Sequence, residues 1–112
     1  MKSILICALT AAAVLSSTAA MANADLAKKN NCLACHQVDK KLVGPAYQDV
    51  AKKYAGDKGA EAMLFDRVKK GSDATGGPHW KAVTGGVPMP PNVLVKDEDI
   101  RALVKWILAG AK

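Results

Sequence analysis

Hydrophobic side chains recur at helical spacing in three parts of the chain. In 47–54 they occupy positions i, i+3, i+4 and i+7, which predicts one buried face of an amphipathic helix. A second stripe lies within 59–70 and is followed by Gly71, and a third follows the acidic run 97–99, whose charge suits the first turn of a helix. The stripes consist of Tyr47, Val50, Ala51 and Tyr54; Ala60, Met63, Leu64 and Val68; and Ile100, Leu103, Val104, Ile107 and Leu108.

Two further segments complete this pattern. The stretch 25–31 predicts a short helix, because an acidic residue begins it and Lys28 and Lys29 lie toward its end. The stretch 71–95 holds five of the nine glycines and four of the five prolines and has no helical period, so it predicts one long loop, of the kind that wraps something or carries function. No segment alternates with period two. The fold class is therefore all-α, with about four helices.

The first 22 residues have the layout of a secretory signal peptide. Lys2 precedes an apolar stretch over 4–15, and small residues follow at 19–22. The apolar stretch is shorter than the roughly 20 residues that a membrane-spanning helix needs. We expect cleavage after Ala22, with Ala24 as the alternative, so that 1–22 is removed and 23–112 forms a single domain.

Charge and size narrow the class of function. Removal of Lys2 leaves 15 basic and 10 acidic residues, a net charge of +5. The lysines form scattered pairs without interleaved aromatic residues, which disfavours nucleic acid and favours an acidic protein partner. A domain this small often needs a bound group to complete its core.

The segment Cys32-Leu33-Ala34-Cys35-His36 has the C-x-x-C-H form that attaches c-type haem. Two thiols at this spacing lie on one side of a helical turn and can both add to the vinyl groups of one porphyrin edge. The imidazole of His36 is then the proximal iron ligand. The alternatives are a redox-active thiol pair, which would need a β-α-β context, a structural disulfide, and a zinc site, which would need further ligands.

Haem iron takes a sixth ligand, and the candidates outside the leader are Met63, Met89 and His79. Met63 lies on the apolar stripe of a predicted helix, where methionine fills gaps in a core. Met89 lies between Pro88 and Pro90, which hold the backbone extended. We therefore assign Met89 as the distal ligand, with His79 as the alternative.

Five motifs together resemble a known family. The chain is similar over 23–112 to the small bacterial class I cytochromes c of the cytochrome c-551/c-552 type, also called c8. The resemblance implies a class I cytochrome c fold wrapped around one covalently attached haem c. The motifs are Asn31-Cys32-Leu33-Ala34-Cys35-His36, Val43-Gly44-Pro45-Ala46-Tyr47, Arg67-Val68-Lys69-Lys70-Gly71-Ser72, Val87-Pro88-Met89-Pro90-Pro91-Asn92 and Lys105-Trp106-Ile107-Leu108.

The resemblance also assigns roles to individual residues. It implies that His36 and Met89 ligate the iron, that the Pro45 carbonyl accepts a hydrogen bond from His36, and that Asn92 donates to the Met89 sulfur. It further implies that Arg67 approaches a haem propionate.

One segment departs from the family pattern. Members of the family usually carry Gly-Val-Trp-Gly before the methionine, and the tryptophan contacts a propionate. Here 72–87 is longer, and Trp80, the corresponding haem-binding candidate, lies in Pro78-His79-Trp80-Lys81.

With both axial positions filled, the iron has no open site, so we expect a single-electron carrier rather than an enzyme. We expect an apolar shell around the haem from Val43, Tyr47, Leu64, Val68, Ile100, Val104 and Leu108. A haem-based sensor or a peroxidase-like enzyme is the competing hypothesis, and each needs an open iron position. From the leader we expect a periplasmic protein without a membrane span. We also expect a monomer.

The resemblance implies redox protein partners such as nitrite reductase, terminal oxidases or cytochrome c peroxidase. They are expected to dock near an exposed haem edge, whose candidate lining lysines are Lys28, Lys29, Lys40 and Lys41.

Overall fold

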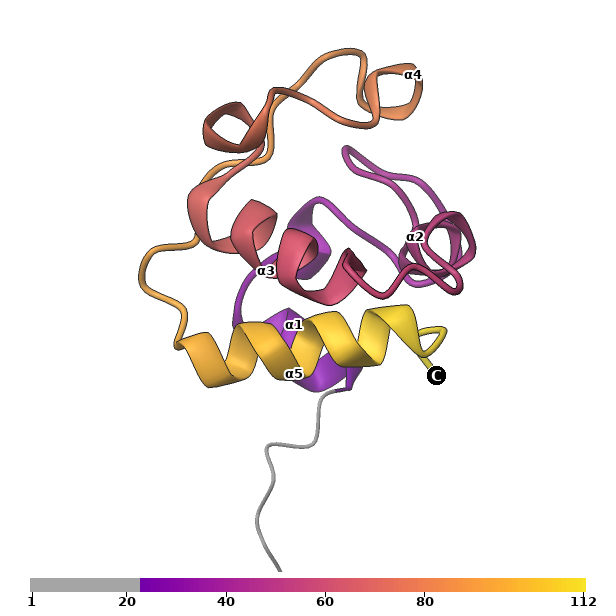
Figure 1. Ribbon diagram of the computed structural model, residues 1–112, viewed down its shortest axis with the longest axis vertical. Helices are drawn as coiled ribbons and strands as arrows, with labels where there is room; N and C mark the ends of the chain where they lie inside the picture. Colours follow the sequence, from indigo (N-terminus) through magenta and orange to yellow (C-terminus); the bar gives the residue numbers. More distant parts are fainter. Residues whose placement is uncertain (1–22) are drawn as a thin grey trace, which may run out of the picture.

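The computed structural model describes residues 23–112 as helices joined by loops, with no strand in that range (Figure 1). The predicted leader lies outside these residues. In the described range no helix is both long and apolar enough to cross a bilayer. The elements are α1 (Ala24–Lys29), η1 (Cys32–Ala34), α2 (Tyr47–Lys53), α3 (Ala60–Lys70), η2 (Asp73–Thr75), α4 (Lys81–Thr84) and α5 (Asp97–Leu108), where η marks a 3-10 helix.

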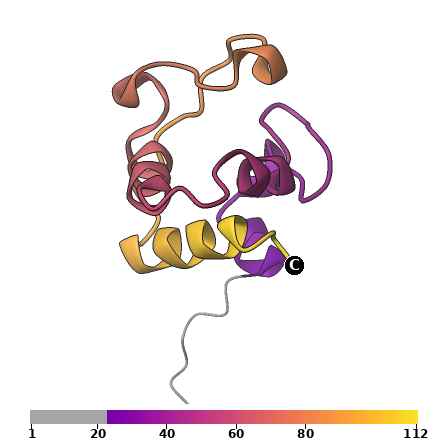
Figure 2. The same cartoon turned by 45° about the vertical axis from the view of Figure 1, so that its right-hand side comes forward.

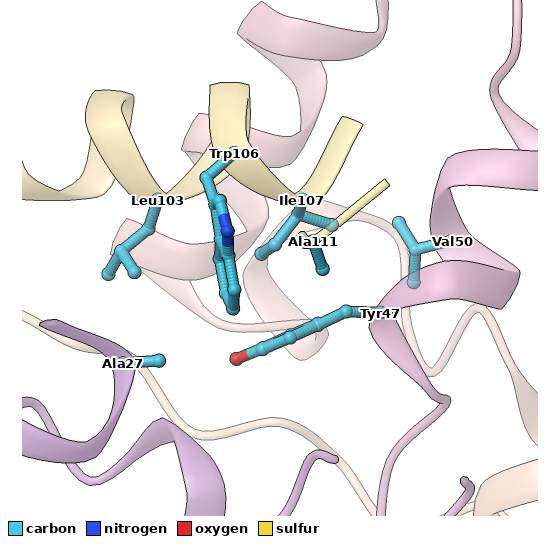
Figure 3. Packing of buried hydrophobic residues seen from close by; sticks show 7 residues of the cluster. All are labelled: Ala27, Tyr47, Val50, Leu103, Trp106, Ile107 and Ala111. Carbon is cyan, nitrogen blue, oxygen red and sulfur yellow. The ribbon is translucent and has the colours of Figure 1, made fainter. Parts of the chain in front are cut away.

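Helix α5 organises the packing. It contacts α1, α2 and α3, and it lies at the opposite end of the molecule from α4 in both views (Figures 1 and 2). Its buried side chains are those of the predicted stripe together with Trp106, with Leu108 only partly buried. The seven buried residues of the main cluster join α1, α2, α5 and the C-terminal segment (Figure 3): Ala27, Tyr47, Val50, Leu103, Trp106, Ile107 and Ala111.

Local signals explain where these helices begin and end. The Asn23 side chain accepts a hydrogen bond from the Leu26 N–H at 3.1 Å and so caps the start of α1. Helix α3 ends at Gly71, whose φ of 82° is open to glycine at little cost. Lys69 pairs with Asp97 at 2.8 Å and so ties the last turn of α3 to the first turn of α5.

The all-α prediction is confirmed, and the four predicted helices correspond to α1, α2, α3 and α5. The prediction that 71–95 is one continuous loop is wrong, because η2 and α4 lie within it. Each of these elements is a single turn, which is too short to show a hydrophobic period.

Candidate functional site

A large cleft opens among the loops and helices α3 and α5. It encloses about 1070 Å³ of space not filled by atoms, including its open mouth, and its walls are mostly apolar. Wall residues come from three separated parts of the sequence, 32–50, 64–90 and 103–107. Of the predicted site residues, the cleft brings together Cys32, Cys35, His36, Pro45, Arg67, Trp80 and Met89.

The segment that carries the two thiols is a tight turn. Asn31 has a left-handed backbone, with φ of 61°, and starts η1. The N–H groups of Cys35 and His36 then both donate to the Cys32 carbonyl, at 3.2 and 3.0 Å. This turn places both thiols and the imidazole on the wall of one cleft.

The thiols of Cys32 and Cys35 are free and not joined in a disulfide. Burial raises the pKa of the Cys32 thiol, and a hydrogen bond with Tyr47 lowers it by less. The Cys32 sulfur lies 3.8 Å from the Asn30 carbonyl oxygen. Both cysteine side chains are partly buried, and neither is used in a disulfide, so both thiols are available to attach a group in the cleft.

The His36 ring is held by three neighbours. Its Nδ1 lies 2.8 Å from the Pro45 carbonyl oxygen, which is the contact that the resemblance implies. The ring stacks on Tyr47, with centroids 5.0 Å apart and planes inclined by 18°. Gly44 lies close against the ring, and a Cβ at this position would be 2.5 Å from the His36 Cε1.

This arrangement suits a metal-binding imidazole. Burial lowers the pKa of His36, and the hydrogen bond to Pro45 raises it by less, so the ring is neutral at pH 7. A carbonyl that accepts a hydrogen bond from Nδ1–H fixes the tautomer in which the lone pair of Nε2 is free to bind a metal.

An aromatic chain connects this ring to the core. Tyr47 meets Trp106 of α5 edge-on, with centroids 5.7 Å apart and planes inclined by 76° (Figure 3). The Trp106 indole N–H donates to the Lys112 carbonyl at 3.1 Å. The orientation of the imidazole is therefore set by packing that reaches the C-terminal end of α5.

Met89 is held by its own backbone. Its N–H donates to the Ser72 hydroxyl at 3.0 Å, and the Ser72 N–H donates to the Met89 carbonyl at 3.0 Å. Gly71 makes this approach possible, because a Cβ there would lie 2.9 Å from the Met89 carbonyl oxygen. Met89, a wall residue of the cleft, is thus carried by a loop fixed to the end of α3.

Asn92 follows the same loop but is not a wall residue. Its side-chain nitrogen donates to the carbonyls of Val68 at 3.0 Å and Pro90 at 3.3 Å. These bonds cap α3 and brace the loop that carries Met89. The hydrogen bond from Asn92 to the Met89 sulfur stays a prediction.

Cationic and aromatic side chains gather around Arg67 and Trp80, two further wall residues. Arg67 donates from Nη1 to the Tyr54 hydroxyl at 2.7 Å, and its guanidinium lies 5.9 Å from the centre of the same ring. Lys53 places its ammonium 4.5 Å from the centre of the Trp80 ring. Arg67 and Trp80 therefore line one wall, where a group with a carboxylate would find partners.

Two nitrogen atoms show what this part of the cleft lacks. Among residues 23–112, the buried Arg67 Nε and His79 Nε2 have no hydrogen-bond partner. Buried donors are normally satisfied, so their neighbourhood fits an anionic acceptor. Two thiols, a neutral imidazole, a thioether, apolar walls and these donors together fit haem c.

The predicted apolar shell is correct in part. Val43, Tyr47, Leu64, Val68 and Val104 are wall residues, whereas Ile100 and Leu108 are not. Leu103 and Ile107 take their place, because the rotation of α5 turns a different flank of its stripe to the cleft. The four candidate lysines are all exposed but none is a wall residue, and their role at a haem edge stays a prediction.

Sequence reasoning missed several functional neighbours. Ser72, Tyr54 and Lys53 take part in the contacts above, but their contacts could not be foreseen. Ser72 ends one of the five motifs and Tyr54 is the last member of the stripe over 47–54, whereas a lysine on a helix surface such as Lys53 gives no recognisable pattern.

Comparison with known proteins agrees with this geometry. The sequence profile of the family described as cytochrome c matches residues 20–111. Cytochrome c-552 of Nitrosomonas europaea is 51% identical over 98 residues, covering 88% of this chain and 87% of that protein. Cytochrome c-551 of Pseudomonas aeruginosa is 49% identical over 84 residues, covering 75% and 72%.

Solved structures give the same result. The crystal structure of wild-type Nitrosomonas europaea cytochrome c552 superimposes with a TM-score of 0.68 at 51% identity, covering 79% of this chain and 99% of that one. The class 1 cytochrome MtoD from Sideroxydans lithotrophicus ES-1 gives a TM-score of 0.63 at 36% identity, covering 80% and 92%.

Proposed function

The chain belongs to the cytochrome c family, and from that premise we propose that it is a periplasmic single-electron carrier with His36 and Met89 as its two iron ligands. Family membership gives the coarser part of this statement, an electron carrier with haem c attached through Cys32 and Cys35. The axial pair, the compartment and the partners belong to the proposal.

The observation that carries the proposal is that His36 and Met89 line the same cleft as Cys32 and Cys35. Haem c, when bound, supplies an iron that exchanges one electron between Fe(III) and Fe(II). The chain supplies everything else: covalent anchors, a neutral imidazole, a soft sulfur and apolar walls.

Each of these groups has a distinct effect. The Pro45 carbonyl keeps the His36 ring in the tautomer that binds a metal through Nε2. A thioether is a soft ligand, so Met89 favours Fe(II) and raises the reduction potential relative to a second imidazole. Apolar walls exclude water, which disfavours the extra positive charge of Fe(III) and acts in the same direction.

Rigidity supports electron transfer rather than catalysis. Both candidate ligands are held by hydrogen bonds that involve the backbone. His36 is held by the Pro45 carbonyl, and the N–H and the carbonyl of Met89 are both bonded to Ser72. Two fixed axial ligands leave no position open for a substrate. The competing sensor and peroxidase-like functions require Met89 to leave the iron.

Localisation and partners complete the proposal. The leader-like composition of 1–22 supports export, with cleavage that leaves a domain starting near residue 23. The net positive charge supports acidic redox proteins as partners, and the family resemblance points to nitrite reductase, a terminal oxidase or cytochrome c peroxidase.

The test is a visible spectrum of the protein purified from a host that exports it and attaches haem. We expect a sharp c-type alpha band on reduction. We also expect a weak far-red sulfur-to-iron charge-transfer band in the oxidised form that disappears in Met89→Ala and persists in the matched variant Met63→Ala. Rapid binding of carbon monoxide by the reduced wild type would overturn the assignment of Met89 and favour a sensor or an enzyme.

A further inference from the structure

His79 belongs to the part of the chain that departs from the family pattern, and the axial-ligand proposal leaves it without a role. Its ring is partly exposed, yet its Nε2 is covered and has no partner among the described residues. Arg67 Nε is also buried without a hydrogen-bond partner, and Arg67 and His79 line the same cleft. Arg67 Nε is a donor, and His79 Nε2 donates when the ring is protonated, so a single acceptor placed between α3 and the segment that carries His79 could bind both nitrogens.

The Arg67 side chain and the backbone that leads to His79 are both held in place. Arg67 is held by the Tyr54 hydroxyl at 2.7 Å. The loop before His79 is closed on itself, because the Gly77 N–H donates to the Ser72 carbonyl at 2.8 Å and the Thr75 hydroxyl donates to the Gly71 carbonyl at 2.8 Å. Unpaired donors held this firmly are pre-organised for a bound group.

The loop is also anchored beyond His79. Trp80 packs against the main hydrophobic cluster, and its ring lies beneath the Lys53 ammonium at 4.5 Å. Gly76 lies beside the imidazole, since a Cβ there would meet the His79 Cε1 at an ordinary contact distance of 3.5 Å. The imidazole therefore lies between two fixed points of the loop.

The charges around His79 have one sign. Burial lowers the pKa of His79, as do the Arg67 guanidinium from α3 and the Lys53 ammonium from α2, while the Thr75 carbonyl in η2 raises it. A carboxylate here would be stabilised by both of these cations, and it would favour the protonated form of the imidazole.

We propose that His79 and Arg67 together hold one of the two carboxylates that haem c carries, and that His79 exchanges a proton with solvent as the iron changes oxidation state. This inference rests on the proposed function. On reduction a donor protein delivers one electron to the iron, and His79 takes up one proton from solvent. On oxidation the electron passes to an acceptor protein, and the proton returns to solvent.

The sign of the coupling follows from electrostatics. One added electron makes the cleft more negative by one charge, in surroundings of low dielectric constant, and so favours the imidazolium. Reduction is then easier where His79 is protonated. The reduction potential must fall as pH rises through the range in which histidine titrates, about pH 5 to 8.

The first measurement is an equilibrium redox titration of the holoprotein against a reference dye between about pH 5 and about pH 8. For the wild type we expect the equilibrium constant for reduction to fall about threefold, which is about 30 mV at 59 mV per tenfold for a one-electron couple. In His79→Gln the fall should be absent. The matched variant Lys81→Gln, which removes an exposed neighbouring charge, should keep it.

The second measurement is an NMR titration of the imidazoles in both oxidation states. The chain has two histidines, and an iron-bound His36 does not titrate, so His79 can be followed alone. We expect its midpoint at higher pH in the reduced protein. This measurement uses the wild type and decides the matter if His79→Gln does not fold.

The outcomes separate the two proposals. If the far-red band is present and the titrations are independent of oxidation state, the role of His79 is wrong and the carrier function stands. If His79→Gln abolishes that band, His79 is itself an iron ligand, which overturns this inference. A chain without covalently bound haem would overturn both.

Discussion

Gly44 has no side chain because the His36 ring occupies the space where one would lie. A Cβ at position 44 would meet the His36 Cε1 at 2.5 Å, and the ring cannot retreat because Tyr47 stacks on it. Gly44→Ala should therefore displace the imidazole and lower the free energy of unfolding by about 1–3 kcal/mol, as overpacking does.

Gly59→Ala is the matched control, because a Cβ there would meet its nearest neighbour at an ordinary 3.5 Å. Its effect should stay within about 1 kcal/mol. Denaturant unfolding measures both variants, and the visible spectrum reports the displaced ligand. Equal losses in the two variants would show that the close contact with His36 is unimportant.

Ser72 gives the second prediction on a single side chain. Its hydroxyl is the acceptor for the Met89 N–H, so Ser72→Ala leaves that donor without its partner at a cost of about 1 kcal/mol. We expect the far-red band to be lost at a lower temperature than in the wild type. Asp57→Ala is the control, because Asp57 also accepts one backbone N–H, that of Gly59, and is not a wall residue of the cleft. An unchanged melting of the band would contradict the role of Ser72.

At the scale of elements, α5 separates the stability of the fold from the integrity of the site. Ile100 is completely buried but is not a wall residue of the cleft. Ile100→Ala should thus cost about 2–5 kcal/mol in unfolding free energy while the spectrum at low temperature stays unchanged. Leu94→Ala, at a side chain that is 95% exposed, should cost almost nothing. A spectral change in Ile100→Ala would show that α5 transmits its packing to the site.

The junction between α3 and α5 is sensitive to pH. The hydrogen bond and charge of Lys69 hold the pKa of Asp97 below its ordinary value of 3.8. Because the folded pKa is the lower one, the stabilisation is present above the unfolded pKa and is lost as pH falls through the folded pKa. Asp97→Asn should lower the melting temperature slightly at pH 6, and the difference should vanish once the pH has fallen below the folded pKa of Asp97.

Glu98→Gln is the control for that variant, since it removes the same charge from the first turn of α5 without breaking the pair. Circular dichroism during heating measures both variants. A loss in Asp97→Asn that persists in strong acid would mean that the pair with Lys69 is not its cause.

Periodicity in the sequence predicted the helices that present a long stripe, α2, α3 and α5, because burial on one face leaves a repeat that can be read. It could not predict α4, since four residues make one turn. The spacing of Cys32, Cys35 and His36 predicted one wall of the site. The hydrogen bonds of Asn92 to Val68 and of Met89 to Ser72 could not be predicted, because they depend on how α3 packs against a distant loop. The choice of Leu103 over Ile100 as a wall residue depends on the rotation of α5, which no local pattern encodes.

For the whole molecule, the positions of the lysine pairs relative to the cleft differ. The backbone of Lys41 forms an isolated antiparallel β-bridge with that of His36. The loop that carries Lys41 continues into the wall residues Val43 and Gly44. Lys28 and Lys29 lie on α1, which contacts η1 and α5. The first pair is therefore better placed to attract a negatively charged redox partner toward the cleft.

Two double variants test this difference with equal loss of charge. Lys40→Gln/Lys41→Gln should slow oxidation of the reduced protein by the anionic reagent ferricyanide by roughly threefold at low ionic strength, and salt should remove the effect. Lys28→Gln/Lys29→Gln should slow it less. Stopped-flow mixing measures both rates, and the reverse order would place the electron-transfer face beside α1.

The order of the cleft walls along the chain has a consequence for biogenesis. Cys32 precedes every other wall residue, and the last of them belong to α5. A polypeptide exported with its N-terminus leading presents both thiols before the remaining walls have emerged. Haem attached at that moment would act as a template on which the later segments fold. The enzymes that attach haem would then act on an unfolded polypeptide and not on a completed cleft.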